Sequence, residues 1–262
     1  MSLPADSHVH SEFSWDAARR GTGSMERTCA RAVEIGLPAL AFTEHLDHTA
    51  WLDYTAPPLD VDGYLESVER CRDLFPQLRI LTGLEIGEPH WHPEPVAKLL
   101  AGGRFERVLG SLHSLRVPAG IAEANSVYLL RPAADVVRDY LTELPQLIAG
   151  SDVFEALTHI DYPARHWPAD EGRFDPYAFE EEFRVALRAL AGTGRALEIN
   201  TRRPLDEVVL RWWHQEGGDA VTFGSDAHEP DALARGFADA AAMAQAHGFR
   251  PGPRPYDWWS RS

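Results

Sequence analysis

The chain has 262 residues and a formal charge of −15, from 25 Lys and Arg against 40 Asp and Glu. Such an acidic chain repels polyanions, so we expect no nucleic-acid partner. A small phosphate ester is not excluded, because bound divalent cations would dominate the local field. No apolar stretch approaches the roughly 18 residues of a membrane span, and the N-terminus lacks a signal-peptide pattern. With only Cys29 and Cys71 as cysteines, we expect a cytoplasmic protein without membrane contact.

Short apolar runs alternate with amphipathic stretches, which predicts strands alternating with helices. In chain order these are a strand at 4–10, a helix at 25–35, a strand at 39–45, a helix at 62–74, strands at 79–85 and 107–113, a helix at 133–149, a strand at 154–159, a helix at 176–191, a strand at 196–200, a helix at 204–215, a strand at 220–224 and a helix at 231–247. Pro145 should kink or interrupt its helix. Residues 120–131 and 163–174 are expected to form loops near a site.

The alternation predicts an α/β fold with a parallel sheet and short connections. An open doubly wound sheet and a closed barrel both fit that pattern. No internal repeat or linker divides the sequence. We therefore expect a single domain over residues 1–262, a length that suits an α/β barrel.

Polar side chains gather where the predicted strands end. His8 and His10 form an H-x-H, and residues two apart on a strand point to the same face. Five further strands end in His45, Glu85, His113, His159-Ile160-Asp161 and Asp226-Ala227-His228. This C-terminal end is where barrel enzymes assemble their active sites.

Any one of these histidines would most simply be a core residue bonded to the backbone. Burying them all without a cation would cost on the order of several kcal/mol per ionised group. Imidazole and carboxylate ligands suit Zn, Mn or Fe, and the absence of cysteine ligands argues against a structural zinc site. The set therefore predicts a metal centre.

The chain resembles the PHP (polymerase and histidinol phosphatase) family, and most closely its histidinol-phosphatase branch. The resemblance rests on motifs in the family's order: DSHVHSEFSWDA at 6–17, FTEHLD at 42–47, GLEIGE at 83–88, GSLHSL at 110–115, THIDYPAR at 158–165, LEINTR at 197–202 and FGSDAHEP at 223–230. It implies a distorted (β/α)7 TIM-like barrel and a small phosphorylated substrate. Glu44 is a departure, since many relatives carry Asp there, and residues 116–131 match nothing in the family pattern.

The resemblance also implies three divalent metal ions and their ligands. The first ion would be held by His8, His10, Glu85 and Asp226. Glu85 would bridge to a second ion on His113 and His159. The third ion would be held by His45, His228 and Asp16. Paired ions lower the pKa of a water and stabilise charge on a transferring phosphate.

Other residues receive roles that follow from this chemistry. Asp226 and His228 are the candidates for proton transfer. Arg165, Arg202 and Arg203 are candidates to bind phosphate, because the guanidinium fork pairs with phosphate oxygens. His48, His90, His92 and His166 lie in loops at the same rim and are expected outside the ligand set. Trp15, Trp51, Trp91 and Trp167 are candidates to wall a pocket.

The leading expectation for function is hydrolysis of L-histidinol phosphate to L-histidinol and phosphate. A nucleotide or sugar phosphate is the alternative substrate. An amidohydrolase-type enzyme also carries H-x-H on its first strand, but it usually has a lysine on the fourth strand, where this chain has His113. A degenerate, non-enzymatic module would lack ligands, whereas every expected position is filled. The sequence leaves the oligomeric state open.

Overall fold

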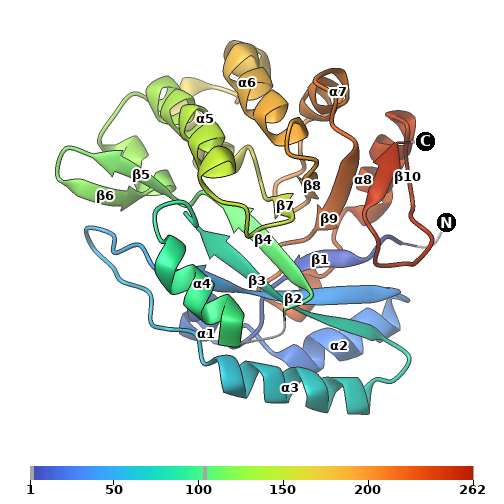
Figure 1. Ribbon diagram of the computed structural model, residues 1–262. Helices are drawn as coiled ribbons and strands as arrows, with labels where there is room; N and C mark the ends of the chain where they lie inside the picture. Colours follow the sequence, from blue (N-terminus) through green and yellow to red (C-terminus); the bar gives the residue numbers. More distant parts are fainter. Residues whose placement is uncertain (1–2, 103–104, 262) are drawn as a thin grey trace.

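The computed structural model describes residues 3–102 and 105–261; Met1, Ser2 and Ser262, at the ends of the expected domain, lie outside this part of the chain. Its core is a curled sheet with helices around the outside (Figure 1). Strands run in the order β1-β2-β3-β4-β7-β8-β9-β11-β10. Pairing is parallel from β1 through β9 and antiparallel where β11 joins β9 and β10. The expected α/β barrel is confirmed.

The strands of the parallel run are β1 (Asp6–Val9), β2 (Ala39–Asp47), β3 (Arg79–Gly87), β4 (Arg107–Ser111), β7 (Ala156–Leu157), β8 (Ala196–Asn200) and β9 (Ala220–Gly224). The curl brings the two ends of this run together. The Asp226 amide donates to the His8 carbonyl at 2.8 Å, and the His10 amide donates to the Ala227 carbonyl at 2.8 Å. An isolated parallel bridge joins Val9 to Ala227. The contact is shorter than a full ladder, so the barrel is distorted at this seam.

The helices are α1 (Trp15–Arg20), α2 (Met25–Glu34), α3 (Val61–Leu74), α4 (Pro93–Gly102), α5 (Ala133–Gly150), α6 (Glu180–Ala191), α7 (Glu207–Gln215) and α8 (Phe237–Ala246). N-cap residues mark where several helices begin. The side chains of Ser24, Asp60 and Asp206 accept hydrogen bonds from backbone N–H groups in the first turns of α2, α3 and α7. Short 3₁₀ turns fill the connections: η1 (Ala124–Leu129), η2 (Tyr162–His166), η3 (Ala169–Glu171), η4 (Pro176–Phe179) and η5 (Pro230–Ala232). No helix of the described residues has the length and apolarity to span a membrane.

Three sequence expectations were wrong in detail. Helix α5 continues through Pro145, because buried Leu141, Leu144 and Leu147 pack it against the core on both sides of the proline. Residues 120–131 are not an irregular loop, since β5 (Ser114–Val117) and β6 (Gly120–Glu123) form an antiparallel hairpin that continues into η1. The helix expected from residue 231 begins at Phe237, after η5.

Some elements that are short or lie at the end of the chain were not predicted from the sequence. These are α1, α4 and the terminal strands β10 (Phe249–Arg250) and β11 (Trp259–Arg261). Trp259 pairs with Val221 of β9, so the tail docks on the sheet.

Candidate metal centre

One buried carboxylate lies at the centre of the polar rim. Glu85, near the end of β3, has an exposed fraction of 1%. Its Oε2 lies 3.1 Å from His8 Nε2, 3.3 Å from His10 Nε2 and 3.0 Å from His45 Nδ1. Its Oε1 lies 2.7 Å from His159 Nε2 and 3.2 Å from His113 Nε2. Five imidazoles from four strand ends thus meet at the residue expected to bridge two ions.

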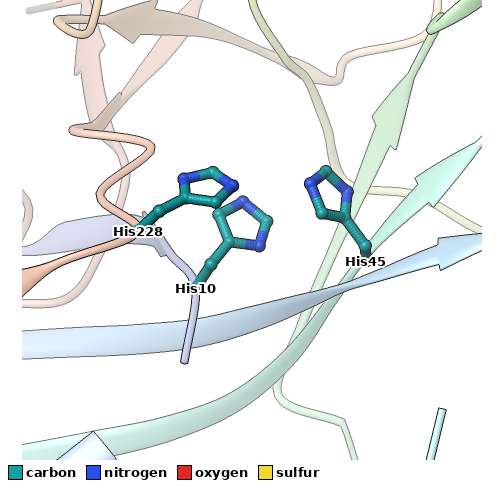
Figure 2. Close-up of side chains that lie close together, drawn as sticks. All are labelled: His10, His45 and His228. Carbon is teal, nitrogen blue, oxygen red and sulfur yellow. The ribbon is translucent and has the colours of Figure 1, made fainter. Parts of the chain in front are cut away.

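A second group of side chains adjoins the first. The ring centroid of His10 lies 4.3 Å from that of His45 and 4.2 Å from that of His228, and Figure 2 shows the three rings close together. Asp16, from α1, completes the group: its Oδ2 is 2.8 Å from His228 Nε2 and its Oδ1 is 3.6 Å from His45 Nε2. Asp226 Oδ1 is 3.6 Å from His10 Nε2. All the ligands expected from the sequence therefore lie in one continuous cluster.

The polar atoms of this cluster fit bound cations. Glu85 Oε2, His45 Nδ1 and His228 Nε2 are buried and have no hydrogen-bond partner among the described residues. His45 Nδ1 lies 3.0 Å from Glu85 Oε2, and His228 Nε2 lies 2.8 Å from Asp16 Oδ2, so these potential ligand atoms are close together without a well-aligned hydrogen bond. A buried acceptor left in this state is costly. The set of nitrogen and oxygen donors, without a thiolate, suits divalent metal ions.

Three donor groups are compact enough to hold one ion each: His8, His10 and Glu85; His45, Glu85 and His113; and His10, His45 and His228. The first agrees with the expected ligands of the first ion. The others differ from the expected division, because His45 reaches toward both Glu85 and His228. The three donor groups therefore overlap, since His10, His45 and Glu85 each belong to two of them.

Electrostatics within the cluster are strongly coupled. Burial opposes ionisation of Glu85, but His8 and His45 lower its pKa well below the usual value. Burial opposes protonation of His45, yet Glu85 and Asp16 raise its pKa to about 9. Burial lowers the pKa of His159 to about 4. Protons and metal ions compete for the same nitrogens, so metal binding must release protons here.

A further layer of groups orients the imidazoles. Glu198 Oε1 is 2.6 Å from His8 Nδ1, and Asp47 Oδ1 is 2.9 Å from His113 Nδ1. Ser14 Oγ is 2.8 Å from His10 Nδ1 and donates to Glu44 Oε2 at 2.5 Å. Such partners fix the tautomer of a metal-binding histidine. Glu44, the departure from the family pattern, thus supports His10 through Ser14, and burial raises the pKa of Glu44 to about 7.

These supporting residues were not assigned from the sequence. Asp47 carried a usable signal, because it follows His45 by two residues on the same strand and so shares its face. Glu198 had the same kind of signal at the end of the predicted sixth strand. Ser14 had none, because its contact with His10 depends on the turn into α1.

The three arginines expected to bind phosphate line a cavity of about 720 Å³ together with Asp16, His45, Glu85, His113, His159 and Asp226. Arg165 Nη2 is 2.6 Å from Asp226 Oδ2, and Arg202 Nη1 is 3.0 Å from Asp226 Oδ1. Arg203 Nη1 is 3.1 Å from Asp161 Oδ2. Guanidinium groups thus lie beside the ligand cluster in a space large enough for a small substrate.

Asp226 is held in an unusual backbone conformation, with φ 52°. Its amide is tied to His8 across the barrel seam, and this contact over-determines the local backbone. Burial opposes its ionisation, but Arg165 and Arg202 lower its pKa well below the usual value. Asp226 is therefore an ionised carboxylate that pairs with both arginines beside the donor cluster.

The remaining rim histidines are His48, His90, His92 and His166, and two of them have partners outside the cluster. His90 Nε2 lies 2.9 Å from Glu143 Oε1, and His92 Nε2 lies 2.9 Å from Thr49 Oγ1. His166 is exposed and lines the large cavity. None of them belongs to a donor group found among the described residues.

The rim tryptophans divide into two kinds. Trp15 and Trp51 line the large cavity. Trp91 lines a separate, smaller hollow, and Trp167 packs edge-on against Phe174 with ring centroids 5.4 Å apart.

Known proteins resemble this chain over most of its length. A histidinol-phosphatase from Lactococcus lactis is 26% identical over 233 residues, covering 85% of this chain and 83% of the relative. A "Probable histidinol-phosphatase" from Deinococcus radiodurans is 30% identical over 261 residues, covering 92% of each chain. The crystal structure of histidinol phosphate phosphatase from Lactococcus lactis, complexed with zinc, L-histidinol and phosphate, has a TM-score of 0.84 and 24% identity, and the match covers 95% of each chain.

The barrel, its donor cluster and these relatives define a metal-dependent phosphatase. The PHP domain family model matches residues 6–202. This chain belongs to the PHP domain family, as its strand-end motifs predicted.

Proposed function

We propose that this phosphatase hydrolyses L-histidinol phosphate to L-histidinol and inorganic phosphate. The observation that carries the proposal is the single cavity in which the donor cluster around Glu85 meets Arg165, Arg202 and Arg203. Two relatives named histidinol-phosphatases support the choice of substrate. So does the related crystal structure, which contains zinc, L-histidinol and phosphate.

The same proposal assigns three divalent metal ions, Zn, Mn or Fe, to the donor cluster. Their ligands would be His8, His10, Asp16, His45, Glu85, His113, His159, Asp226 and His228, with Glu85 shared between ions. When bound, such ions act as Lewis acids and make water a stronger nucleophile at neutral pH. The unpartnered donors Glu85 Oε2, His45 Nδ1 and His228 Nε2 support this assignment.

In the reaction, a water oxygen forms a bond to phosphorus, the ester P–O bond breaks, and a proton from water ends on the departing alcohol. Arg165 and Arg202 would donate N–H groups to the non-bridging phosphate oxygens, and Arg203 would assist from the cavity wall. Their present partners, Asp226 and Asp161, hold the guanidinium groups in place. Asp226 and His228, whose Oδ1 and Nδ1 lie 3.5 Å apart beside these arginines, are the proposed proton carriers.

We also propose that residues 1–262 form a single domain. One hydrophobic cluster runs from Val9 in β1 to Trp259 in β11, so both ends of the described chain share one core. A further domain boundary would have to divide this cluster.

The substrate proposal is tested by loading the purified protein with Zn, Mn or Fe and measuring phosphate release. We expect kcat/KM for histidinol phosphate to exceed that for p-nitrophenyl phosphate, nucleotides and sugar phosphates by at least about tenfold, a difference of about 1.4 kcal/mol in transition-state binding. Activity on all esters without that preference would refute the substrate and favour a broader phosphatase.

The position of the site is tested by His113→Ala. This variant should lose turnover, because His113 contacts Glu85 at the centre of the cluster. The matched control is His247→Ala, since His247 lies after α8, where it pairs with Glu207. Wild-type turnover of His113→Ala would show that the metal centre lies elsewhere.

A further inference from the structure

Part of the large cavity is lined by residues that neither bind the expected metals nor suit phosphate. These are Trp15, Trp51, Glu123, Asn125 and Tyr162. Phosphate would occupy only a fraction of a cavity of about 720 Å³, so the alcohol part of a substrate needs a place there. The chemistry of these side chains indicates what that part carries.

Glu123 is fixed close to a metal ligand by the β5–β6 hairpin. It is the last residue of β6 and pairs with Ser114, the residue after His113. The next amide along, that of Ala124, donates to the His113 carbonyl at 2.7 Å. The hairpin that the sequence did not reveal thus places a carboxylate beside the centre.

The charge of Glu123 is not neutralised within the described part of the chain. Tyr162 donates its hydroxyl hydrogen to Glu123 Oε1 at 2.8 Å, and Asn125 Nδ2 donates to the same oxygen at 2.6 Å. Both donors are neutral, and no ion pair involves Glu123 among the described residues. The other acidic residues lining the cavity, by contrast, contact histidines or arginines: Asp16, Asp47, Glu85 and Asp226.

Asn125 provides a second, independent sign of a missing donor. Its Nδ2 is occupied by Glu123, which orients the amide, while its Oδ1 is buried and has no hydrogen-bond partner among the described residues. A carboxylate and an amide oxygen together suit a ligand that brings N–H donors and a positive charge.

Aromatic rings complete this part of the cavity. Trp51 donates its indole N–H to Ser114 Oγ at 2.8 Å, so it lies against the hairpin that carries Glu123. Trp15 lies next to it, with ring centroids 5.7 Å apart. Both indole N–H groups are occupied within the protein, Trp15 by Asp47 and Trp51 by Ser114. The rings themselves remain available to a flat or cationic group.

We infer that Glu123 and Asn125, walled by Trp15 and Trp51, form a subsite for a protonated nitrogen on the alcohol part of the substrate. Tyr162 joins this subsite to the phosphate wall, because its hydroxyl holds Glu123 while Arg165 lies 5.0 Å over its ring. The enzyme would then select phosphate monoesters that carry an amine or imidazolium group. This inference rests on the proposed phosphatase function and makes Glu123 the residue that determines specificity.

The test compares Glu123→Gln with wild-type enzyme on two pairs of esters: histidinol phosphate with p-nitrophenyl phosphate, and 3-aminopropyl phosphate with n-propyl phosphate. Glutamine keeps the shape and hydrogen bonds of the side chain but removes its charge. We expect kcat/KM to fall about 10- to 100-fold for the two esters whose alcohol part carries a protonated nitrogen. For the two esters whose alcohol part is uncharged, kcat/KM should stay within about twofold. Glu181→Gln, an exposed carboxylate on α6, is the matched control and should change neither.

Binding of L-histidinol gives a readout that does not depend on turnover. Calorimetry should show about 10- to 100-fold weaker binding to Glu123→Gln. Asn125→Ala should also weaken binding, because it removes the unpartnered acceptor. Equal losses of kcat/KM on esters with a cationic and with an uncharged alcohol part would overturn the inference. Unchanged histidinol binding in both variants would also overturn it.

The two proposals fail in different ways. Wild-type enzyme that prefers 3-aminopropyl over n-propyl phosphate but does not favour histidinol phosphate would refute that substrate and retain the subsite. Wild-type enzyme that favours histidinol phosphate, with no charge-selective loss in Glu123→Gln, would retain the substrate and refute the subsite.

Discussion

Asp47 offers the sharpest test of how the barrel supports its metal centre. Its side chain is fully buried and joins two groups: Oδ1 lies 2.9 Å from His113 Nδ1, and Oδ2 accepts the Trp15 indole N–H at 2.9 Å. Burial opposes ionisation of Asp47, but His113 lowers its pKa below the usual value. A carboxylate in this position fixes the ring of His113 and strengthens its other nitrogen as a ligand.

The substitution Asp47→Asn keeps the volume of the side chain but removes its charge. The amide has one oxygen and one NH₂ group, so only one of its two partners can still donate to it. Leaving a buried donor unpaired costs about 1–3 kcal/mol. We therefore expect metal affinity, measured by competition with a chelator, to fall about 10- to 100-fold.

Two controls separate the causes of such a loss. Asp53→Asn changes an exposed carboxylate nearby in the chain and should leave metal affinity unchanged. Trp15→Phe removes the other partner of Asp47 while keeping the contact with His113, so it should affect metal affinity much less than Asp47→Asn. Wild-type metal affinity in Asp47→Asn would refute the view that this carboxylate orients His113.

Two further predictions concern the stability of the centre and its packing. Removing metal with a chelator should lower Tm by at least about 5 °C, because one ion at 100 times its Kd contributes about 2.7 kcal/mol; calorimetry checks this, restored Zn or Mn should reverse it, and an unchanged Tm would contradict a metal centre. Gly224→Ala should reduce turnover at least about tenfold, because the added methyl would overlap Glu198 Oε1 and lie 2.6 Å from His8 Cβ, which overpacks the site. Gly102→Ala, whose added methyl meets no described atom within 4 Å, is the control, and equal turnover in both variants would refute this account.

The sequence by itself determined which segments along the chain form the barrel strands and which polar residues lie at the strand ends. That was possible because strand periodicity is a local property, and because helices between successive strands indicate that the strands run parallel. His8 and His10, two residues apart on one strand, had to share a face. His45, Glu85 and His113 had to lie at one rim once their strands were parallel. The resemblance to the family's motifs then indicated which of these positions to expect as metal ligands.

Tertiary structure alone decided how these side chains meet. The five imidazoles reach Glu85 only because the sheet curls until β1 contacts the chain after β9. Asp47 supports His113, which lies 66 residues away in sequence, and Glu198 supports His8, which lies 190 residues away. Glu123 enters the cavity through a short hairpin with no strong periodic signal. Such contacts depend on distances between segments remote in sequence, which no local pattern contains.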